Sequence, residues 1–519
     1  MNGARALLDT LVGAGVDVCF ANPGTSEMHF VAALDSVPEM RGVLTLFEGV
    51  ATGAADGYAR IAGKPAAVLL HLGPGLGNGL ANLHNAKRAN VPMVVVVGDH
   101  ATYHKRYDAP LESDIDALAG SVSGWLRRTA SANDVGTDTV EAIRAASGPP
   151  GRIATLILPA DVSWTDGASP AKSQPTADRA QLTESVEVAK VLRGGEPSLV
   201  LLGGDATGEA GLTAASRIAV ATGARLLCET FPARLTRGAG LPALDRLGYF
   251  AEAAAAQLDG VKHLILAGAR APISFFAYPG KPSDLVPAGC DVHVLAETGH
   301  ATDALTALAD EIAAGASPQL AAAARPPLPS GDLTGDAIAA AVGALVPEHA
   351  IVVDESNTAG LTLPAATAVA PRHDWLTLTG GAIGYGLPAG VGAAIAAPDR
   401  KVLCLQADGS AMYTPSALWT MAREQLDVTT VIYNNGAYDI LRLELQRVGA
   451  QTTGNAPGPR AEALLDLDPP RMDFAALATG MGVPARRATT AEEFADALSE
   501  ALATPGPHLI DAVVPSMMG

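Results

Sequence analysis

Short, continuous runs of apolar residues recur along the chain and predict buried β-strands. In the first third of the chain these runs cover residues 18–21, 66–72, 93–98 and 153–158, with helical patterns between them. Strands that are apolar at every position, rather than at every second one, are typical of a parallel sheet covered by helices on both faces. The pattern therefore predicts a doubly wound α/β fold.

The same pattern occurs in three successive segments. The second segment has predicted strands at 198–202, 225–228, 263–267 and 291–295, and the third at 351–354, 402–405, 429–433 and 508–513. Two stretches with turn-forming residues and little periodicity, 165–181 and 314–332, predict linkers between the segments. We therefore expect three doubly wound parallel-sheet domains, at 1–170, 185–315 and 333–519.

Composition and charge narrow the classes of partner. The 54 acidic and 35 basic residues give a net charge of −19, which argues against nucleic acid or an anionic membrane because both require basic patches. No apolar run is long enough to span a bilayer. The four cysteines are scattered without metal-ligand spacing, as expected for reduced thiols in a cytoplasmic protein.

The stretch 401–438 carries the strongest chemical signal. A predicted strand ends in an Ala-Asp-Gly-Ser turn at 407–410, a helical pattern follows, and a second strand ends in Asn-Asn-Gly at 434–436. Such a β–α–β unit places both strand ends at one edge of a parallel sheet, where open α/β sheets bind ligands. The Asp408 carboxylate, the Asn435 amide oxygen and a nearby backbone carbonyl suit Mg²⁺, and the N–H groups of Gly409 and Ser410 suit a phosphate. Either turn alone would be ordinary, but together they predict a site for a metal diphosphate.

Two residues of the first segment are candidates for proton transfer. Glu48 lies among apolar and small residues, although a lone Glu at a strand-to-helix junction is usually a helix cap or solvated. His71 ends a predicted strand and precedes a Gly-rich stretch, 72–79, which we expect to be a loop; a strand-end His is often only a hydrogen-bonded polar residue. Upstream, an Asn-Pro-Gly-Thr-Ser-Glu turn at 22–27 precedes a helix that Thr25 or Ser26 could cap.

These strings together resemble the motifs of the thiamine diphosphate enzyme superfamily. The family's diphosphate motif is Gly-Asp-Gly followed after a helix by Asn-Asn, here with Ala407 in place of the first glycine. The string around Glu48 resembles the family's glutamate motif. The resemblance implies thiamine diphosphate and Mg²⁺ as cofactors, and a pyrimidine-binding, a central and a diphosphate-binding domain in that order. It also implies a homodimer or homotetramer, because in the family Glu48 and the metal site meet across a subunit boundary.

The resemblance also implies roles for single residues. Glu48 would hydrogen-bond the aminopyrimidine ring and so promote loss of the cofactor's C2 proton. His71 aligns with a histidine of benzoylformate decarboxylase, and Thr25 with that enzyme's active-site serine. The implied metal ligands are Asp408, Asn435 and the carbonyl of Ala437. The residues implied at the cofactor are Gly24, Glu48, Asn78, Asn357, Thr358, Gly381, Ala382, Ile383, Asp408, Gly409, Ser410, Asn435, Ala437 and Tyr438.

Some residues keep two interpretations. Ile383 matches the apolar residue that wedges the family's cofactor into a bent shape, but core packing explains it as well. Arg442 and Gln446, one helical turn apart, could reach a substrate acid group or form an exposed helix face. The Gly-rich turn at 203–208 is interpreted as structural, with FAD or another nucleotide as a minor alternative, because a lone Gly-rich turn is a weak motif.

The leading functional hypothesis is an acetolactate synthase-like carboligase that takes a 2-oxo acid such as pyruvate as donor. The first alternative is a simple decarboxylase that releases an aldehyde, like benzoylformate decarboxylase. The stretch 274–280 lacks the histidine that this decarboxylase carries in its central domain. Its absence argues against benzoylformate as the substrate. The second alternative is a non-catalytic relative that keeps the fold; the presence of Glu48 and Asp408 argues against it.

Overall fold

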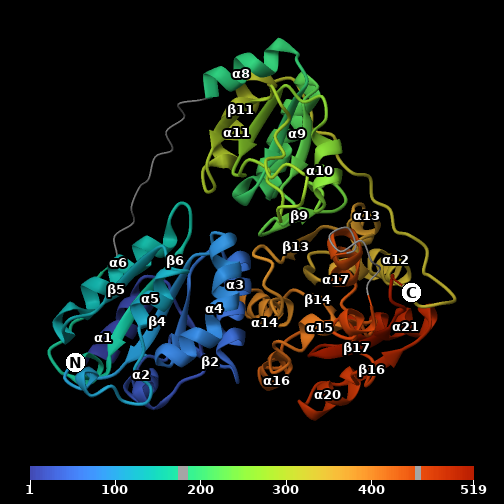
Figure 1. Cartoon of the computed structure of the whole chain (residues 1–519). Helices are drawn as coiled ribbons and strands as arrows, with labels where there is room; N and C mark the ends of the chain where they lie inside the picture. The colour runs from blue at the N-terminus through green and yellow to red at the C-terminus, as the bar shows by residue number, and fades with distance from the viewer. Residues whose placement is uncertain (173–184, 450–457, 519) are drawn as a thin grey trace.

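The computed structural model describes residues 1–172, 185–449 and 458–518, and these form three α/β parts (Figure 1). Each part is built around its own β-sheet. Figure 1 shows the first part beside the third, with the second above both. The predicted α/β fold with three parallel-sheet domains is confirmed. Of the two predicted linkers, 314–332 forms neither helix nor strand, and much of 165–181 lies outside the described residues.

The first sheet is parallel, with the strand order β2-β1-β3-β4-β6-β5. Strands β3, β4 and β6 are buried at every position, as their continuous apolar runs predict. The strands are β1 (Val18–Ala21), β2 (Arg41–Leu44), β3 (Ala66–Leu70), β4 (Met93–Asp99), β5 (Trp125–Arg128) and β6 (Ile153–Pro159). The helices are α1 (Gly3–Gly13), η1 (Thr25–Glu27), α2 (Met28–Leu34), α3 (Glu48–Ala62), α4 (Leu72–Arg88), η2 (Lys105–Tyr107), α5 (Ile115–Gly120), η3 (Ala132–Asp134), α6 (Val135–Ser147) and α7 (Ala160–Trp164).

The second sheet is also parallel, with the order β11-β10-β7-β8. Its strands are β7 (Ser198–Leu202), β8 (Arg225–Cys228), β10 (His263–Ala267) and β11 (Asp291–Ala296). Its helices are α8 (Ser185–Gly194), η4 (Gly204–Thr207), α9 (Glu209–Thr222), α10 (Ala251–Leu258) and α11 (Ala301–Ile312). Among the residues that the structure describes, no helix of any of the three parts is both long and apolar enough to cross a membrane.

The third sheet has the order β16-β17-β15-β14-β12-β13-β9 and departs from the expected all-parallel arrangement. Strand β9 comes from the segment expected to form the central domain, yet it pairs antiparallel with β13 at the edge of this sheet. The strands are β9 (Leu235–Arg237), β12 (Ile351–Glu355), β13 (His373–Thr377), β14 (Val402–Ala407), β15 (Val428–Asn434), β16 (Ala485–Ala488) and β17 (His508–Val513). The helices are α12 (Gly335–Leu345), η5 (Asn357–Gly360), α13 (Leu363–Thr367), α14 (Gly386–Ala396), α15 (Asp408–Ala411), α16 (Ala417–Arg423), α17 (Asp439–Glu444), η6 (Leu445–Gly449), α19 (Pro459–Glu462), α20 (Phe474–Gly480) and α21 (Ala491–Ala503).

The Gly-rich stretch 72–79 is the first half of α4 and not a loop, so that expectation is wrong. Glycine lowers helix propensity by about 1 kcal/mol per residue relative to alanine, but it also permits close packing. A Cβ at Gly79 would lie 2.9 Å from Thr52 Cγ2 on α3. Packing of α4 on α3 therefore outweighs the local preference of the glycines. The acidic turn expected at 407–410 likewise starts a short helix, α15, directly at Asp408.

Helix α3 of the first part packs directly on α14 of the third (Figure 1). One hydrophobic cluster continues through both parts and includes Tyr58, Leu70, Leu387 and Val402. The contact is close enough that a Cβ at Gly53 would lie 2.6 Å from the Cβ of Pro388. The first and third sheets are thus joined by a shared core and not only by linkers.

A buried ion pair on α3 connects all three parts. The guanidinium of Arg60 donates to the Asp56 carboxylate from Nε at 2.6 Å and from Nη2 at 2.8 Å. Its Nη1 also donates to the carbonyl oxygens of Ala233, at 3.0 Å, and of Thr377, at 2.8 Å. Ala233 precedes β9 and Thr377 ends β13, so one side chain on α3 contacts both the second segment and the third sheet.

Removing the Arg60 guanidinium should destabilise the fold. We expect Arg60→Ala to lower the free energy of unfolding by about 3–5 kcal/mol, because the Asp56 carboxylate would remain buried without its partner. Urea denaturation followed by circular dichroism measures the change. Lys64→Ala is the matched control, since it removes the partner of Asp17 in a largely exposed pair and should cost less than about 1 kcal/mol. Equal losses in the two variants would contradict the expectation.

Candidate active site

Asp408 directly follows β14 and is buried at the carboxyl edge of the third sheet, where its parallel strands end. Each carboxylate oxygen accepts one backbone hydrogen bond, Oδ1 from Gly409 at 2.7 Å and Oδ2 from Gly436 at 2.8 Å. Burial raises the pKa of Asp408 to about 6, because these N–H groups replace only part of the lost hydration. Ala407 has a φ of −71°, so alanine fits the turn without strain.

Asn435 follows the neighbouring strand β15, and the structure brings it to the same edge as Asp408. Its side-chain Nδ2 donates to Asp439 Oδ2 at 3.0 Å, and its Oδ1 accepts from the backbone N–H of Ala437 at 3.0 Å. The ring of Tyr438 lies against Gly409, where a Cβ would come within 2.3 Å of Tyr438 Cε1. The two ends of the predicted β–α–β unit are therefore in direct contact.

Asn357 and Ser410 lie together at this edge, where the N-terminus of η5 approaches α15. The amide Nδ2 of Asn357 donates to Ser410 Oγ at 3.1 Å. Asn357 is exposed and has a positive φ of 53°, a left-handed conformation that asparagine tolerates better than most residues. Thr358 follows it on η5 and is half-buried. These side chains could reach a ligand that lies on Asp408.

The loop 380–386 carries Gly381, Ala382 and Ile383. Gly381 has a φ of 73° and no atom within 4 Å of the position of a Cβ, so its backbone is open. Ala382 is fixed by Asn85 of α4, which donates to its carbonyl at 2.8 Å and accepts from its N–H at 3.2 Å. Ile383 is half-buried against the shared core, so both of its interpretations remain open.

Glu355, which we did not single out from the sequence, anchors the same loop. Its buried carboxylate accepts from the backbone N–H of Gly384 at 2.7 Å and of Gly386 at 2.6 Å, and from Gln406 Nε2 at 2.8 Å. Burial raises the pKa of Glu355. The signal available in the sequence was an acidic residue at the end of the apolar strand β12.

Glu48 is the first residue of α3, and only 8% of its surface is exposed. Its Oε2 accepts from Asn78 Nδ2 of α4 at 3.0 Å. Its neighbour Gly49 is linked to the third part through Asn82, whose Nδ2 donates to the carbonyls of Gly49, at 2.8 Å, and Gly384, at 3.2 Å. Within a single chain, the Asn82 side chain therefore bridges the start of α3 and the loop 380–386.

His71 caps the start of α4 and faces the turn at 22–27. Its Nδ1 lies 2.9 Å from Glu27 Oε2 and 3.1 Å from Ser26 Oγ. Glu27 is buried and accepts from the Gly24 N–H at 2.8 Å. It was missed in the sequence because its contact with His71, distant along the chain, forms only in the fold. The cap expected from Thr25 or Ser26 is not formed: Gly24 is at the cap position of η1 and Glu27 at that of α2, Ser26 bonds Glu27, and Thr25 is exposed.

Two protein-family models match the chain. The thiamine pyrophosphate enzyme N-terminal TPP binding domain matches residues 1–119, and the C-terminal TPP binding domain of the same enzymes matches residues 361–512. A Mycobacterium tuberculosis protein named "Putative acetolactate synthase large subunit IlvX" is 73% identical over 519 residues, with 100% of both chains covered. The chain belongs to the thiamine pyrophosphate enzyme family.

Other relatives include decarboxylases. Benzoylformate decarboxylase of Pseudomonas aeruginosa is 32% identical over 530 residues, covering 96% of each chain. Among solved structures, the thiamine diphosphate-dependent 4-hydroxybenzoylformate decarboxylase of Rhodococcus jostii RHA1 has a TM-score of 0.85 at 26% identity and covers 100% of both chains. The predicted family is thus confirmed, as is a thiamine diphosphate-dependent enzyme related to acetolactate synthases and 2-oxo acid decarboxylases. The roles of the individual residues stay predictions.

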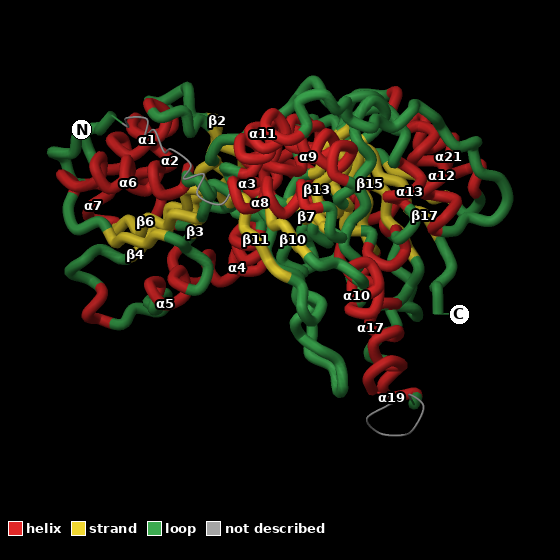
Figure 2. The backbone as a smooth tube through the Cα atoms, turned by 90° about the horizontal axis from the view of Figure 1, so that it is seen from above, coloured by secondary structure: helices red, strands yellow, loops and turns green. Residues whose placement is uncertain are grey.

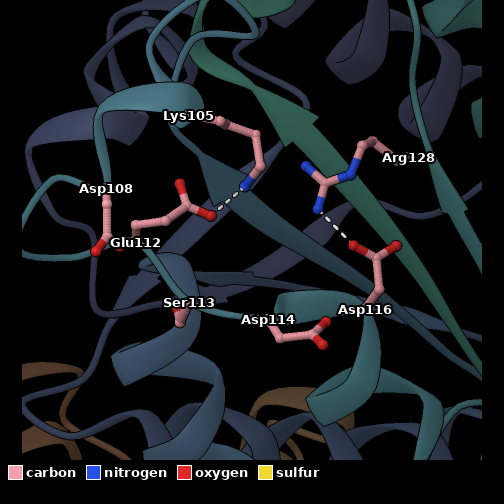
Figure 3. Close-up of a pocket in the computed structure, with 7 residues that line it drawn as sticks. All are labelled: Lys105, Asp108, Glu112, Ser113, Asp114, Asp116 and Arg128. Carbon is pink, nitrogen blue, oxygen red and sulfur yellow. Dashed lines mark hydrogen bonds and ion pairs between the residues drawn. The ribbon is translucent and has the colours of Figure 1, made fainter.

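A pocket of about 440 Å³ lies at the carboxyl edge of the first sheet of this thiamine pyrophosphate enzyme (Figure 3). Lys105 Nζ lies 2.5 Å from Glu112 Oε1, and Arg128 Nη2 lies 2.6 Å from Asp116 Oδ2. Both cations also pair with the buried Asp99 at the end of β4. Lys105 and Arg128 are therefore already paired with carboxylates. The predicted site residues lie outside this pocket.

The Gly-rich turn at 203–208 is closely packed against residues 298–302. A Cβ at Gly204 would lie 2.4 Å from Thr298 Cγ2, and the Asp205 carboxylate accepts from the backbone N–H of Thr302 at 2.8 Å. The turn packs against the start of α11, which supports its structural interpretation. Arg442 donates to Ser516 Oγ at 3.1 Å and pairs with Asp466, whereas Gln446 is exposed.

Asp408 should make the stability of the cofactor-free protein depend on pH. Its folded pKa of about 6 exceeds the ordinary value of 3.8, so the folded state binds this proton more tightly than the unfolded chain. The free energy of unfolding should therefore fall as the pH rises from about 4 to about 6, by about 3 kcal/mol from this group. Asp408→Asn should lose that part of the dependence, measured as urea midpoints at pH 4.5 and 7. Identical pH dependence in both proteins would contradict it.

Proposed function

We propose that the chain binds thiamine diphosphate with Mg²⁺ and uses it to cleave or form a C–C bond beside the carbonyl of a 2-oxo acid. The observation that carries this proposal is the buried Asp408 carboxylate beside the Asn435 amide. They follow neighbouring parallel strands, at the edge where such sheets bind ligands.

The residues at this edge fit the cofactor. Asp408 is a buried carboxylate whose bonded partners are backbone N–H groups, so a cation would supply the missing positive charge. Mg²⁺ usually takes one or two protein carboxylates together with phosphate oxygens, and the Asn435 amide and Ala437 carbonyl would add oxygen ligands. Asn357, Thr358, Gly409 and Ser410 would bind the diphosphate. Gly24, Asn78, the open backbone of Gly381, Ala382, Ile383 and Tyr438 would contact the rest of the cofactor.

The chain's own residues would orient the cofactor and move protons. When bound, thiamine diphosphate supplies the nucleophilic carbon and the electron sink for chemistry beside a carbonyl. Glu48, held by Asn78 at 3.0 Å, would hold a proton at a nitrogen of the aminopyrimidine ring. An N–H donated by His71 Nδ1 to Glu27 would leave Nε2 to exchange a proton with the substrate.

For the reaction we propose an acetolactate synthase-like carboligase with a 2-oxo acid such as pyruvate as donor. The support is the relative named an acetolactate synthase large subunit, at 73% identity over the full chain. A non-catalytic relative is disfavoured, because Glu48 and Asp408 are both present and placed at sheet edges.

A simple decarboxylase that releases an aldehyde is the second candidate. The His71–Glu27 contact favours it, because release of an aldehyde needs a proton that such a pair can deliver. A second observation is the position of the aromatic residues of 274–280 beside α17. Tyr278 OH donates to Glu444 at 3.0 Å, and Phe275 and Phe276 are exposed. Product analysis with pyruvate and with benzoylformate would distinguish the two reactions.

The proposal includes a homodimer or homotetramer in the cytoplasm, acting on 2-oxo acid and aldehyde substrates. Thr25, Asn357 and Gly381 are exposed in the single chain although each is a predicted site residue. A second copy that covers them would complete the site. Cys19, Cys228 and Cys404 are free and buried, as expected for a reducing compartment.

Asp408→Ala should abolish metal-dependent cofactor binding. The wild type should bind thiamine diphosphate in calorimetry only when Mg²⁺ is present, because the metal joins the diphosphate to the protein. We expect the variant to lose more than about 100-fold in affinity, since outer partners of metal ligands alone contribute about 10–100-fold. A titration in EDTA is the control. Equally tight binding by wild type and variant would remove Asp408 from the proposed metal site.

Glu48 and His71 should act at different steps. Glu48→Gln should bind Mg²⁺ and the cofactor nearly normally but exchange the cofactor's C2 proton more slowly, by about 100- to 10,000-fold, the usual contribution of a general acid–base group. His71→Ala should keep C2 exchange and lose turnover by a similar factor. Acid-quenched hydrogen–deuterium exchange read by NMR, beside turnover, measures both. Normal exchange in Glu48→Gln, or wild-type turnover in His71→Ala on every accepted substrate, would refute the respective role.

A further inference from the structure

Asp439 is a buried carboxylate at the start of α17, next to the proposed metal site. Its Oδ2 accepts from Asn435 Nδ2 at 3.0 Å and from the backbone N–H of Met517 at 2.8 Å. Its Oδ1 accepts from Ser516 Oγ at 2.6 Å. The nearest cation, Arg442 Nη1, is 3.7 Å away. One buried acid thus holds Asn435 on one side and the end of the chain on the other.

The contact with Asp439 determines which way the Asn435 amide points. A carboxylate only accepts hydrogen bonds, so it binds the NH₂ end of an amide and repels the oxygen end. With Nδ2 on Asp439, Oδ1 points to the opposite side, where the N–H of Ala437 now meets it at 3.0 Å. Asp408 lies at the same carboxyl edge, where its Oδ2 accepts from the N–H of Gly436, the residue between Asn435 and Ala437. Without Asp439, the two amide orientations would differ much less in energy, and an amide in the flipped orientation would offer a cation N–H groups instead of oxygen.

Asp439 in turn depends on the chain terminus. A buried carboxylate is costly unless donors surround it, and Ser516 and Met517 supply two of its three hydrogen bonds. Ser516 is itself fixed by Arg442 Nη1 at 3.1 Å. The topology brings these residues together: β17 pairs directly with β15, with Val513 opposite Asn434, so the chain leaves the sheet beside Asn435. Figure 2 shows α17 and α19 projecting away from the body of the molecule. Ser516 contacts Asp439 and Arg442 in the first turn of α17.

We propose that Asp439 is a positioning residue for the metal site, and that Ser516 and Met517 hold it in place. The C-terminal tail is then a functional part of the cofactor site, acting through Asp439 on the orientation of the Asn435 amide. This inference rests on the proposed function, since it concerns the ligand that Asn435 would provide to Mg²⁺. Partners of metal ligands orient them and typically contribute about 10–100-fold to metal affinity.

The test compares two substitutions of nearly equal shape at Ser516. Ser516→Thr keeps the hydroxyl that donates to Asp439, and Ser516→Val removes it. Calorimetry would measure Mg²⁺ affinity of the full chain with thiamine diphosphate at saturation. We expect about 10-fold weaker Mg²⁺ binding for Ser516→Val and near wild-type affinity for Ser516→Thr. Met517→Pro, which removes the backbone N–H that donates to Asp439 Oδ2, should weaken Mg²⁺ binding to a similar extent.

Asp466→Ala is the matched control, because Asp466 pairs with the same Arg442 but does not contact Asp439. It should leave Mg²⁺ affinity unchanged, and the melting temperatures of all cofactor-free variants should stay close to one another. Wild-type affinity in Ser516→Val and Met517→Pro would overturn the inference while leaving the proposed function intact. Equal loss of affinity in Ser516→Thr, Ser516→Val and Asp466→Ala would also overturn it, as a general loss of structure. Absence of Mg²⁺-dependent binding in the wild type would refute the proposed function and, with it, this inference.

Discussion

The close packing of α3 on α14 is the constraint on which the rest of the structure depends. A Cβ at Gly57 would lie 2.2 Å from the carbonyl oxygen of Ala389, and one at Gly392 would lie 1.8 Å from that of Ala54. The obstacles are backbone atoms that no rotamer change can move, so the two helices keep a separation that only glycine permits. Both helices start at the candidate site, α3 with Glu48 and α14 with Gly386, the last residue of the loop 380–386. This one contact therefore sets how the first and third sheets present their edges to each other.

The strands that could be predicted are those whose own residues are nearly all apolar, because such a run indicates burial. The expected ranges 198–202 and 263–267 coincide with β7 and β10, because these strands are almost entirely apolar and buried. Strand β13 was missed although it is fully buried, because its Asp374 is satisfied by Arg234 and Arg400 from elsewhere in the chain. The antiparallel β9 was missed for a related reason: three residues carry no periodicity, and their partner strand lies far along the chain.

The site residues differ in the same way: those that were found have a local sequence signal, and those that were missed depend on residues distant in the sequence. Turn chemistry is local, so the spacing of Asp408 and Asn435 placed both at one sheet edge, where the structure has them. Glu27, Glu355 and Asp439 are acids that each contact a partner far along the chain, which only the fold brings to them. Asp439 directly follows the stretch 401–438, yet nothing in its neighbours predicts contact with a serine close to the end of the chain.

Buried negative charge is the common feature of these residues, and it has an energetic consequence. The carboxylates of Glu355, Asp408 and Asp439 are bound by N–H and O–H dipoles, which stabilise a charge but do not neutralise it. Burial raises the pKa of Asp408, and the nearby Asp439 carboxylate raises it further. A divalent cation on Asp408 would relieve both effects. On the proposed function, the cofactor-free protein therefore carries an electrostatic cost at this edge, and part of its stability appears only when the metal binds. The acids that orient the ligands are thus also the groups that favour the cation.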